Sequence, residues 1–487
     1  MEDIQIGLYK MDNISYPDKK NLFRPSKNYP EYQEKDIAEE NNDVYEAVRQ
    51  NFHLLGLDDS HYGSREWNPL GSIIKKGDCV LIKPNLVMDE NKLNGDTECL
   101  YTQPSVVAAV IDYVLIALGN TGEIILGDAP MQECNFKHLI ETSGYLDLVK
   151  YYQKKGKKVS IVDFRELTSN VIDGGVYINT INKDAKGTIN DLKDNSEFYG
   201  TDSRKLNRMR ITNYNPEIMK KHHSPLKHEY YISDYVLKAD VIINMPKPKS
   251  HRKAGATISL KNFVGVNIRK EFLPHHTKGS KDTGGDEYEK KNLIHSIRSA
   301  LLDKKNMYQA NKKYKYVKII QYMIKCCSVI LRFQKNKYVE GSWYGNDTIS
   351  KTVTDINKIV YYADKKGILQ DTKQRKVIII ADMVKSGEGE GPVMPTCKNC
   401  GIIAVGFNPV KFDKVIASIM GFDYEKIPVI VRAAMKKEKY IIDDTPDNIM
   451  VKSNIEELDN RSNDEIKKIR YFDFEPTSGW KGHIEFD

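Results

Sequence analysis

Residues 239–251 read Ala239-Asp240-Val241-Ile242-Ile243-Asn244-Met245-Pro246-Lys247-Pro248-Lys249-Ser250-His251. The β-branched run at 241–243 is typical of a buried strand, and the prolines that follow cannot donate to a neighbouring strand. They also stiffen the backbone that carries Lys247, Lys249 and His251. The segment therefore predicts a strand that delivers cationic groups to its carboxyl end.

The same strand pattern recurs along the chain, at residues 79–82, 123–126, 159–162, 377–380 and 402–405. Helical spacing lies between two of these runs, from Pro104 to Leu118. Alternation of strands and helices is typical of parallel sheets. We therefore expect an α/β protein with a mostly parallel sheet flanked by helices, built as two lobes or as one large domain with helical and loop insertions.

The length of 487 residues exceeds what one hydrophobic core usually serves. We predict an N-terminal extension at 1–75, a first α/β lobe at 76–235, a second α/β lobe at 236–425 with an insertion at 278–350, and a C-terminal segment at 426–487. Polar composition in the insertion indicates an excursion from the core.

The composition of the chain indicates which classes of protein it can belong to. No long uncharged apolar run is present, so we expect no membrane span. The acidic start Met1-Glu2-Asp3 is unlike a secretory signal, and seven scattered cysteines suit a reducing compartment, so we expect a cytoplasmic protein. The net charge of +7 accompanies abundant Asn, Ile and Tyr, a mixture that AT-rich coding produces, and no Lys/Arg block alternates with aromatics. A nucleic-acid partner is not expected.

Four further motifs carry a family resemblance. They are Val80-Leu81-Ile82-Lys83-Pro84-Asn85-Leu86, Leu126-Gly127-Asp128-Ala129, Ser259-Leu260-Lys261-Asn262-Phe263-Val264-Gly265 and Gly389-Glu390-Gly391-Pro392. With the 239–251 segment and in this order, they resemble the domain-of-unknown-function family 362 from Lys76 to Gly421. That resemblance implies no settled activity. Some members carry ferredoxin-like cysteine motifs, but this chain has only Cys397-x-x-Cys400, so we expect no iron–sulfur cluster of its own. Neither a cofactor nor a set of metal ligands is assigned.

The lysines of these motifs are candidate anion ligands. Lys83 ends a buried strand, and Pro84 keeps it out of helical conformation, so its ammonium is expected in the cleft at the carboxyl end of the sheet. Lys247, Lys249 and His251 converge on rigid backbone and favour a phosphate or carboxylate. The alternatives are a surface lysine closing a strand and a solvated lysine turn.

Residues 257–264 follow helical spacing, and the N-terminus of that helix would add partial positive charge to the same pocket. Lys261 and Asn262 form a donor pair on one flank. A lysine among other cations has a lowered pKa, as a general base or an imine-forming lysine needs. We predict that Lys247, Lys249 and Lys261 hold one anion between them.

The glycine-rich segment at 387–392 is interpreted as a flexible lid whose backbone at Gly389 and Gly391 approaches the ligand. Glu388, Glu390 and Asp382 are candidate acid/base or hard-metal groups. An exposed acidic turn is the alternative.

These features predict a cytoplasmic enzyme of unknown reaction that acts on a small anionic metabolite. Its substrate-binding residues would be Lys83, Asn85, Lys247, Lys249, Asn262, Gly389 and Gly391, and its catalytic residues Lys261, His251, Asp128, Asp382 and Glu390. The C-terminal 479–485 segment resembles relatives associated with surface-polysaccharide assembly, which suggests a phosphosugar or nucleotide sugar. The alternatives are a non-catalytic binding or scaffold protein in such an assembly and a redox accessory protein.

Residues 316–333 predict a helix with a narrow polar stripe at Lys318, Gln321, Lys325, Ser328 and Arg332. Burial against the other lobe or in a homo-oligomer is the usual explanation of so much apolar surface. Lysines on its flanks also permit a peripheral membrane contact.

Overall fold

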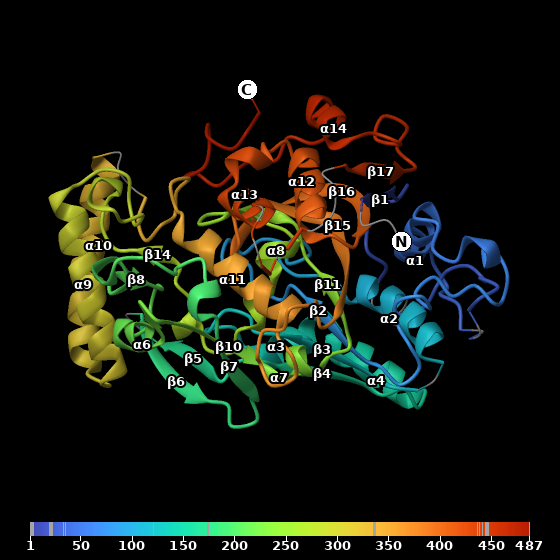
Figure 1. Ribbon diagram of the computed structural model, residues 1–487, viewed down its shortest axis with the longest axis horizontal. Helices are drawn as coiled ribbons and strands as arrows, with labels where there is room; N and C mark the ends of the chain where they lie inside the picture. The colour runs from blue at the N-terminus through green and yellow to red at the C-terminus, as the bar shows by residue number, and fades with distance from the viewer. Residues whose placement is uncertain are drawn as a thin grey trace.

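The computed structural model describes residues 4–18, 23–32, 34, 36–119, 121–172, 175–334, 338–435, 437, 439–440, 442–443 and 448–486. A ten-stranded sheet forms its centre (Figure 1). In spatial order the main strands are β17 (Met450–Ser453), β1 (Gln5–Lys10), β16 (Met394–Gly406), β15 (Lys376–Glu390), β11 (Val241–Met245), β2 (Cys79–Pro84), β3 (Glu123–Asp128) and β4 (Val159–Asp163). All six predicted strands are present, and the predicted α/β class is confirmed.

Pairing is parallel from β15 through β11, β2 and β3 to β4. On the other side, β16 pairs antiparallel with both β15 and β1, and β17 pairs parallel with β1. The short strands β12 (Lys249–His251) and β13 (Gly255–Thr257) branch from β15.

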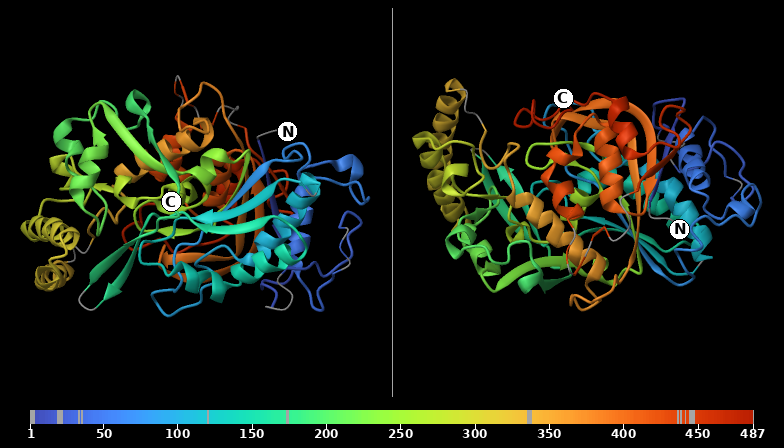
Figure 2. Two further views of the ribbon diagram at one scale, coloured as in Figure 1. Left: turned by 90° about the horizontal axis from the view of Figure 1, so that it is seen from below. Right: turned by 45° about the horizontal axis from the view of Figure 1, so that its top comes forward.

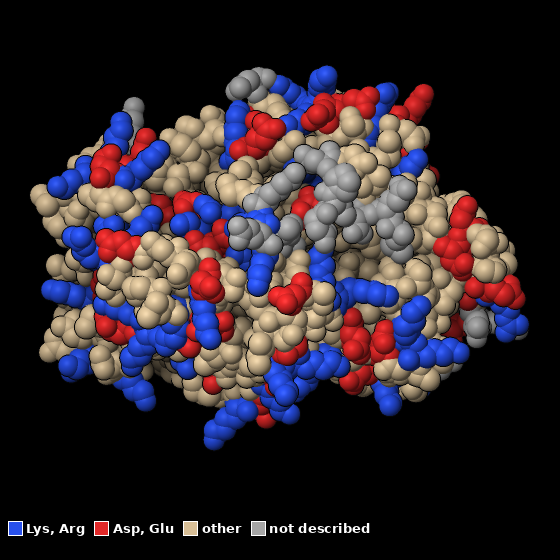
Figure 3. All heavy atoms as spheres, in the orientation of Figure 1, with Lys and Arg blue, Asp and Glu red and all other residues tan. Residues whose placement is uncertain are grey.

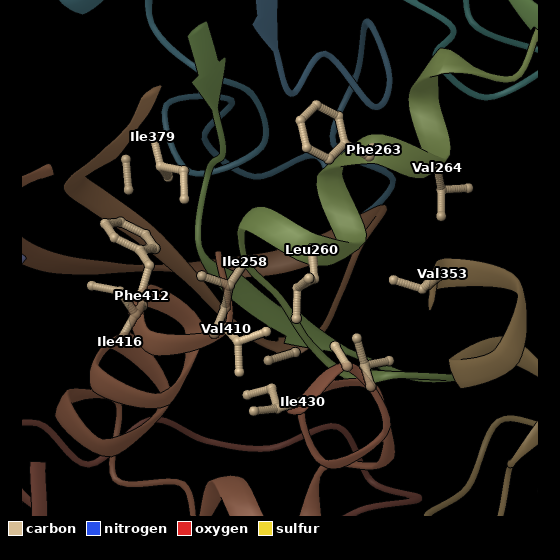
Figure 4. Close-up of a cluster of buried hydrophobic side chains, with 14 of the residues drawn as sticks. Ile258, Leu260, Phe263, Val264, Val353, Ile379, Val410, Phe412, Ile416 and Ile430 are labelled. Carbon is tan, nitrogen blue, oxygen red and sulfur yellow. The ribbon is translucent and has the colours of Figure 1, made fainter. Parts of the chain in front are cut away.

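Helices cover both faces of this sheet because successive strand residues point to opposite sides. Ile82 packs with α1 (Asp43–Leu54), α2 (Pro104–Leu118) and α4 (Tyr145–Lys154) on one face. Leu81 packs with α11 (Thr348–Tyr362), α12 (Pro409–Ile419) and α13 (Pro428–Ala434) on the other. Figure 4 shows part of this second core, where Leu260 and Phe412 lie among aliphatic side chains. The helix predicted from Pro104 to Leu118 has these bounds.

The strand order reverses between β2 and β11, because the chain adds β3 and β4 on one side of β2 before it returns to place β11 on the other. Open α/β sheets bind ligands at the carboxyl ends of strands beside such a reversal. The short helix α8 (Ser259–Asn262) covers this crevice, since Asn262 Nδ2 donates to Asn244 Oδ1 at the end of β11 and to the Lys83 carbonyl at the end of β2.

Smaller elements surround this core. The other helices are α3 (Phe136–Ser143), α5 (Ser203–Leu206), α6 (Pro216–His222), α7 (Asp234–Lys238), α9 (Leu293–Ala310), α10 (Tyr314–Phe333) and α14 (Asn463–Ile469). The minor sheets are β7 (Gly187–Asp191), β10 (Lys227–Ser233) and β9 (His223–Ser224); β14 (His276–Thr277) and β8 (Met209–Arg210); and β5 (Leu167–Ile172) and β6 (Val176–Ile181). Within the predicted insertion, α9 and α10 form a helical hairpin at one edge of the molecule (Figures 1 and 2).

The main sheet takes strands from all four predicted segments: β1 from the first, β2 to β4 from the second, β11, β15 and β16 from the third, and β17 from the last. The segment boundaries themselves stay a prediction. None of the helices in the described residues is both long enough and apolar enough to cross a bilayer.

Two local predictions differ from the structure. The segment predicted as a helix at 257–264 starts in β13, continues as the four-residue α8 and ends in a 3-10 turn at Phe263–Val266. The segment predicted as a flexible lid at 387–392 is the tip of the β15–β16 hairpin. Strand pairing on both sides of that tip holds it in place.

Candidate functional site

Two of the predicted site residues form a buried ion pair at the ends of β2 and β3. Lys83 Nζ lies 2.8 Å from Asp128 Oδ1, and neither side chain is more than 3% exposed. The ammonium also donates to Asn262 Oδ1 at 3.0 Å and to the Pro84 carbonyl at 2.8 Å. Burial lowers the pKa of Lys83, while the Asp128 carboxylate opposes that shift.

The Asp128 carboxylate is fully engaged by these and by backbone donors. Its Oδ2 accepts the N–H of Leu86 at 2.8 Å, and its Oδ1 accepts the N–H of Ala129 at 2.9 Å. Gly265 packs directly against the pair, since a Cβ there would lie 2.0 Å from Asp128 Oδ1. The glycine that closes the Leu-Lys-Asn motif therefore makes room for a charge pair.

A cavity of about 160 Å³ opens beside this pair. Five of the predicted residues line it: Asn85, Asp128, His251, Lys261 and Asn262. The other cationic or potentially cationic residues in its wall are Arg252, Lys253, Lys270 and His275. Among its described lining residues Asp128 is the single carboxylate, and Lys83 already neutralises it. Cationic and potentially cationic side chains therefore outnumber carboxylates in the cavity wall.

Lys261 is the cation best placed to meet a ligand. No hydrogen bond or ion pair joins its ammonium to any residue in the part of the chain that the structure describes. Burial, followed by the neighbouring Lys83 ammonium, lowers the pKa of Lys261 to about 8. The amine is thus near the midpoint of its titration at neutral to mildly basic pH.

Two further lysines in the wall are held by oxygen atoms. Lys253 Nζ donates to Thr212 Oγ1 and to the Glu340 carbonyl, and Lys270 Nζ donates to the Ala129 carbonyl at 2.7 Å. Burial lowers the pKa of both lysines to about 7. Both can therefore shed their charge when the cavity is empty.

The two histidines in the wall have opposite tautomers. His251 Nδ1 accepts the backbone N–H groups of Lys253 and Ala254, both at 3.1 Å, so its proton lies on Nε2. His275 Nδ1 lies 2.9 Å from the Leu273 carbonyl and must donate to it, which leaves Nε2 as an acceptor. Burial and nearby cations hold the pKa of both rings well below the usual value, so both are neutral. The cavity thus offers one imidazole donor and one imidazole acceptor.

Lys247 and Lys249 lie outside this cavity. Lys247 pairs with Asp382 at 3.0 Å, and both side chains are fully buried. Lys249 donates to Asn85 Oδ1 at 2.6 Å and to the Leu100 carbonyl at 2.8 Å. Burial and Lys247 lower the pKa of Lys249. The expected cluster of Lys247, Lys249 and Lys261 around one anion is therefore divided: Lys261 faces the cavity, and Lys249 orients the cavity residue Asn85.

The remaining predicted catalytic and glycine residues also lie away from the cavity wall. The Asp382 carboxylate accepts the Tyr16 hydroxyl at 2.6 Å and the Gln103 N–H at 2.9 Å. Glu390 is exposed at the hairpin tip, where it accepts the Ser478 N–H at 2.8 Å. Gly389 has a positive φ, and Gly391 lies so close to β12 that a Cβ would stand 2.0 Å from the Ser250 carbonyl. Pro392, at the same hairpin tip, does line the cavity.

The α8 N-terminus does not face a ligand. Asp413 of α12 accepts the Ser259 N–H at 2.9 Å and the Leu260 N–H at 3.1 Å. Its carboxylate occupies the place where an anion was expected. The positive charge of the cavity therefore comes from side chains.

Sequence reasoning missed several members of the wall. Lys253 follows His251 by two residues, so extending the predicted segment past the histidine would have included it. His275, which also lines the cavity, was not among the predicted site residues. No sequence motif points to Lys270, because a 3-10 turn at Lys270–Phe272 brings it to the cavity.

Comparison with known proteins places this sequence in a family. A family model described as a domain of unknown function (DUF362) matches residues 80–191 and 196–418, which include most of the cavity wall. A thylakoid-associated protein of Synechocystis sp. is 29% identical over 213 residues, which make up 44% of this chain and 46% of that protein. The chain thus spans less than half the length of this relative. No solved structure matches the chain. Because the family model covers more than half of the chain, the protein belongs to the DUF362 family, as its motifs predicted.

Proposed function

We propose that the cavity binds a small metabolite bearing a phosphate or carboxylate, and that the protein is a cytoplasmic enzyme acting on it. The observation that carries this proposal is Lys261, which lines the cavity and forms no ion pair or hydrogen bond with any residue that the structure describes. Cations crowded in this way raise one another's energy unless an anion lies between them.

The size of the cavity favours a small ligand. Its volume of about 160 Å³ is below the roughly 300–1,000 Å³ of typical drug-sized pockets. Apolar side chains complete the wall, including Val87, Met131, Ile211 and Val264. A phosphosugar, which joins an anion to a compact body, agrees with both features and with a role in surface-polysaccharide or nucleotide-sugar metabolism.

The residues in the wall also support chemistry beyond binding. A lysine with a pKa of about 8 supplies either a proton or a free amine near neutral pH. With these tautomers His251 can donate from Nε2, and His275 can accept at Nε2. We propose Lys261, His251 and His275 as the catalytic group, with Asn85, Lys253 and Lys270 binding the substrate. Asn262 would hold Lys83 in place, because its amide hydrogens are already donated to Asn244 and to the Lys83 carbonyl.

Replacing Lys261 with Met tests this proposal by calorimetric titration with inorganic phosphate, pyrophosphate and glucose 1-phosphate. Methionine keeps the stem of the side chain but removes one charge-assisted hydrogen bond, so affinity should fall by about 1.5 to 3 kcal/mol. The control is Lys150→Met, at an exposed lysine of α4. Equal affinities in the parent, Lys261→Met and Lys150→Met, or no binding by the parent, would exclude this cavity as the site.

A measurement of turnover distinguishes an enzyme from a scaffold protein that binds its ligand in the same cavity. His275→Asn removes the Nε2 acceptor, while its side-chain amide stands where Nδ1 does and can still donate to the Leu273 carbonyl. We expect it to retain ligand binding and to lose conversion of any phosphosugar that the parent consumes. Binding without turnover of any tested phosphosugar by the parent favours the scaffold.

A further inference from the structure

The α9–α10 hairpin exposes an apolar surface that the cavity does not explain. Along α10 five side chains face inward and are buried: Val317, Ile320, Ile324, Cys327 and Leu331. Ile320 and Ile324 pack with Leu302 of α9. This inward face accounts for the pairing of the two helices, but for less than half of the apolar residues of α10.

The outer face of α10 consists of seven large side chains that the structure leaves exposed: Tyr316, Ile319, Tyr322, Met323, Val329, Ile330 and Phe333. At about 100° per residue these positions fall within about 140° of the helix circumference, so they form one continuous stripe. Tyr322 is 71% exposed and Phe333 is 85% exposed. α9 adds exposed Leu293, Ile297 and Met307. Monomeric proteins seldom leave such a stripe in contact with water.

Every formal charge on α10 is positive. Lys318, Lys325 and Arg332 border the outer face on one side, Lys315 lies in the first turn, and the helix contains no Asp or Glu. All four are exposed, and none forms an ion pair with a residue that the structure describes. In Figure 3 the hairpin forms the left edge, where Lys and Arg side chains project from uncharged surface and acidic side chains lie further in.

We propose that the outer face of α10 binds an anionic lipid surface, with the helix lying in the plane of the membrane interface. Helices of this kind bury their apolar stripe among the acyl chains while flanking lysines extend to the headgroups. Aromatic residues such as Tyr316, Tyr322 and Phe333 suit that boundary. The attachment is peripheral.

A second copy of the chain fits this surface less well. A two-fold contact places identical surfaces opposite each other, and the outer face has no carboxylate to neutralise the partner's lysines. The one acidic residue of α9, Asp303, is already held by Arg210 at 2.9 Å and Lys278 at 2.7 Å. Anionic lipid supplies the complementary charge that a second copy lacks.

Vesicle flotation of the full chain tests the proposal. At low salt the protein should float with phosphatidylcholine vesicles that contain phosphatidylglycerol, and not with pure phosphatidylcholine. Lys318→Gln with Lys325→Gln should weaken binding roughly 10-fold or more, since each lysine near the surface contributes to the attraction. Tyr322→Ser with Phe333→Ser should abolish flotation. Exposed Lys150→Gln with Lys366→Gln is the matched control and should float like the parent.

Two results would overturn the proposal: a parent that stays at the bottom of the gradient with anionic vesicles, or variants of α10 that float as well as the parent. A dimer that dissociates on Phe333→Ser, in a protein that does not float, would assign the surface to a second copy instead. Lys261→Met should float normally, which separates this surface from the anion site of the cavity.

Discussion

Single residues show why the lysines could be predicted and their partners could not. The strand-end position of Lys83 follows from the sequence, because Pro84 and the apolar run before it mark the end of a strand. Its counterion comes from the neighbouring strand, where the β2–β3 register sets Ile82 beside Leu126 and brings Asp128 within reach. A single sequence does not reveal this register. Lys83 and Lys247, expected to hold a ligand, instead pair with carboxylates of the protein itself.

Gly265 is predicted to be irreplaceable on steric grounds. An alanine Cβ there would lie 2.0 Å from Asp128 Oδ1 and 2.8 Å from Lys83 Nζ, so the ion pair must separate. Breaking a buried pair costs about 3 to 5 kcal/mol, and we expect Gly265→Ala to lose that much unfolding free energy in urea. The control is Gly95→Ala, at an exposed loop where the nearest atom is a side-chain amide at 3.2 Å. Equal losses in the two variants would show that the ion pair is not the cause.

Lys261 should make the stability of the empty protein depend on pH. Burial and Lys83 lower its pKa from 10.5 to about 8, so between these values the unfolded chain binds a proton that the folded chain does not. The free energy of unfolding therefore rises as pH increases from about 8 towards 10.5, and Lys261→Met lacks this contribution. Across that window the parent should gain up to about 3 kcal/mol relative to the variant in urea denaturation. A difference that stays constant with pH would contradict the assigned shift.

Elements of secondary structure were predicted well where apolar residues form a clear pattern. They were predicted poorly where contacts between distant backbone segments determine the local conformation. The helix at 104–118 follows from its helical spacing, and the six strands follow from short β-branched runs. The glycines of the 387–392 segment stand out in the sequence, but the sequence does not show why glycine is needed there. Gly387 and Gly391 let β12 pass close to the β15–β16 hairpin, since Cβ atoms there would lie 2.9 Å from Lys249 Cβ and 2.0 Å from the Ser250 carbonyl. Close approach between backbones leaves no periodic signal.

The cap of α8 provides a test at this scale. The two Asp413 oxygens accept different backbone N–H groups, from Ser259 and Leu260, and an asparagine has one carbonyl oxygen to offer. Asp413→Asn should therefore leave one buried donor unpaired and lower the free energy of unfolding by about 1 to 3 kcal/mol.

The pH dependence of this effect follows from the carboxyl group. Burial raises the pKa of Asp413 to about 7, so the folded protein binds a proton between about pH 4 and 7 that the unfolded chain has lost. The parent's advantage over Asp413→Asn should shrink as pH rises through that window. Urea denaturation at several pH values measures it, and a growing advantage would contradict the assignment.

At the scale of the whole molecule, the sheet joins parts of the chain that the sequence suggested were separate. β2 belongs to the first predicted lobe and β11 to the second, yet they pair directly, with Leu81 beside Ile242. β1 and β17, which lie outside the family match, close the antiparallel edge. Apolar runs identify strands but not their spatial neighbours, so the order of the strands could not be predicted.

This continuity predicts that the chain unfolds as one unit. Trp67 and Trp480 are buried in the first and last predicted segments, and they belong to cores on opposite faces of the sheet. Two variants each keep one tryptophan as the fluorescent reporter. One keeps Trp67 and carries Trp343→Phe and Trp480→Phe, and the other keeps Trp480 and carries Trp67→Phe and Trp343→Phe. If the shared sheet couples the two faces, fluorescence midpoints in urea should coincide for the two reporters, and the calorimetric and van't Hoff enthalpies should agree. Lobes that unfold independently would give two separated midpoints, because the strands of each lobe would then part at the β2–β11 pairing.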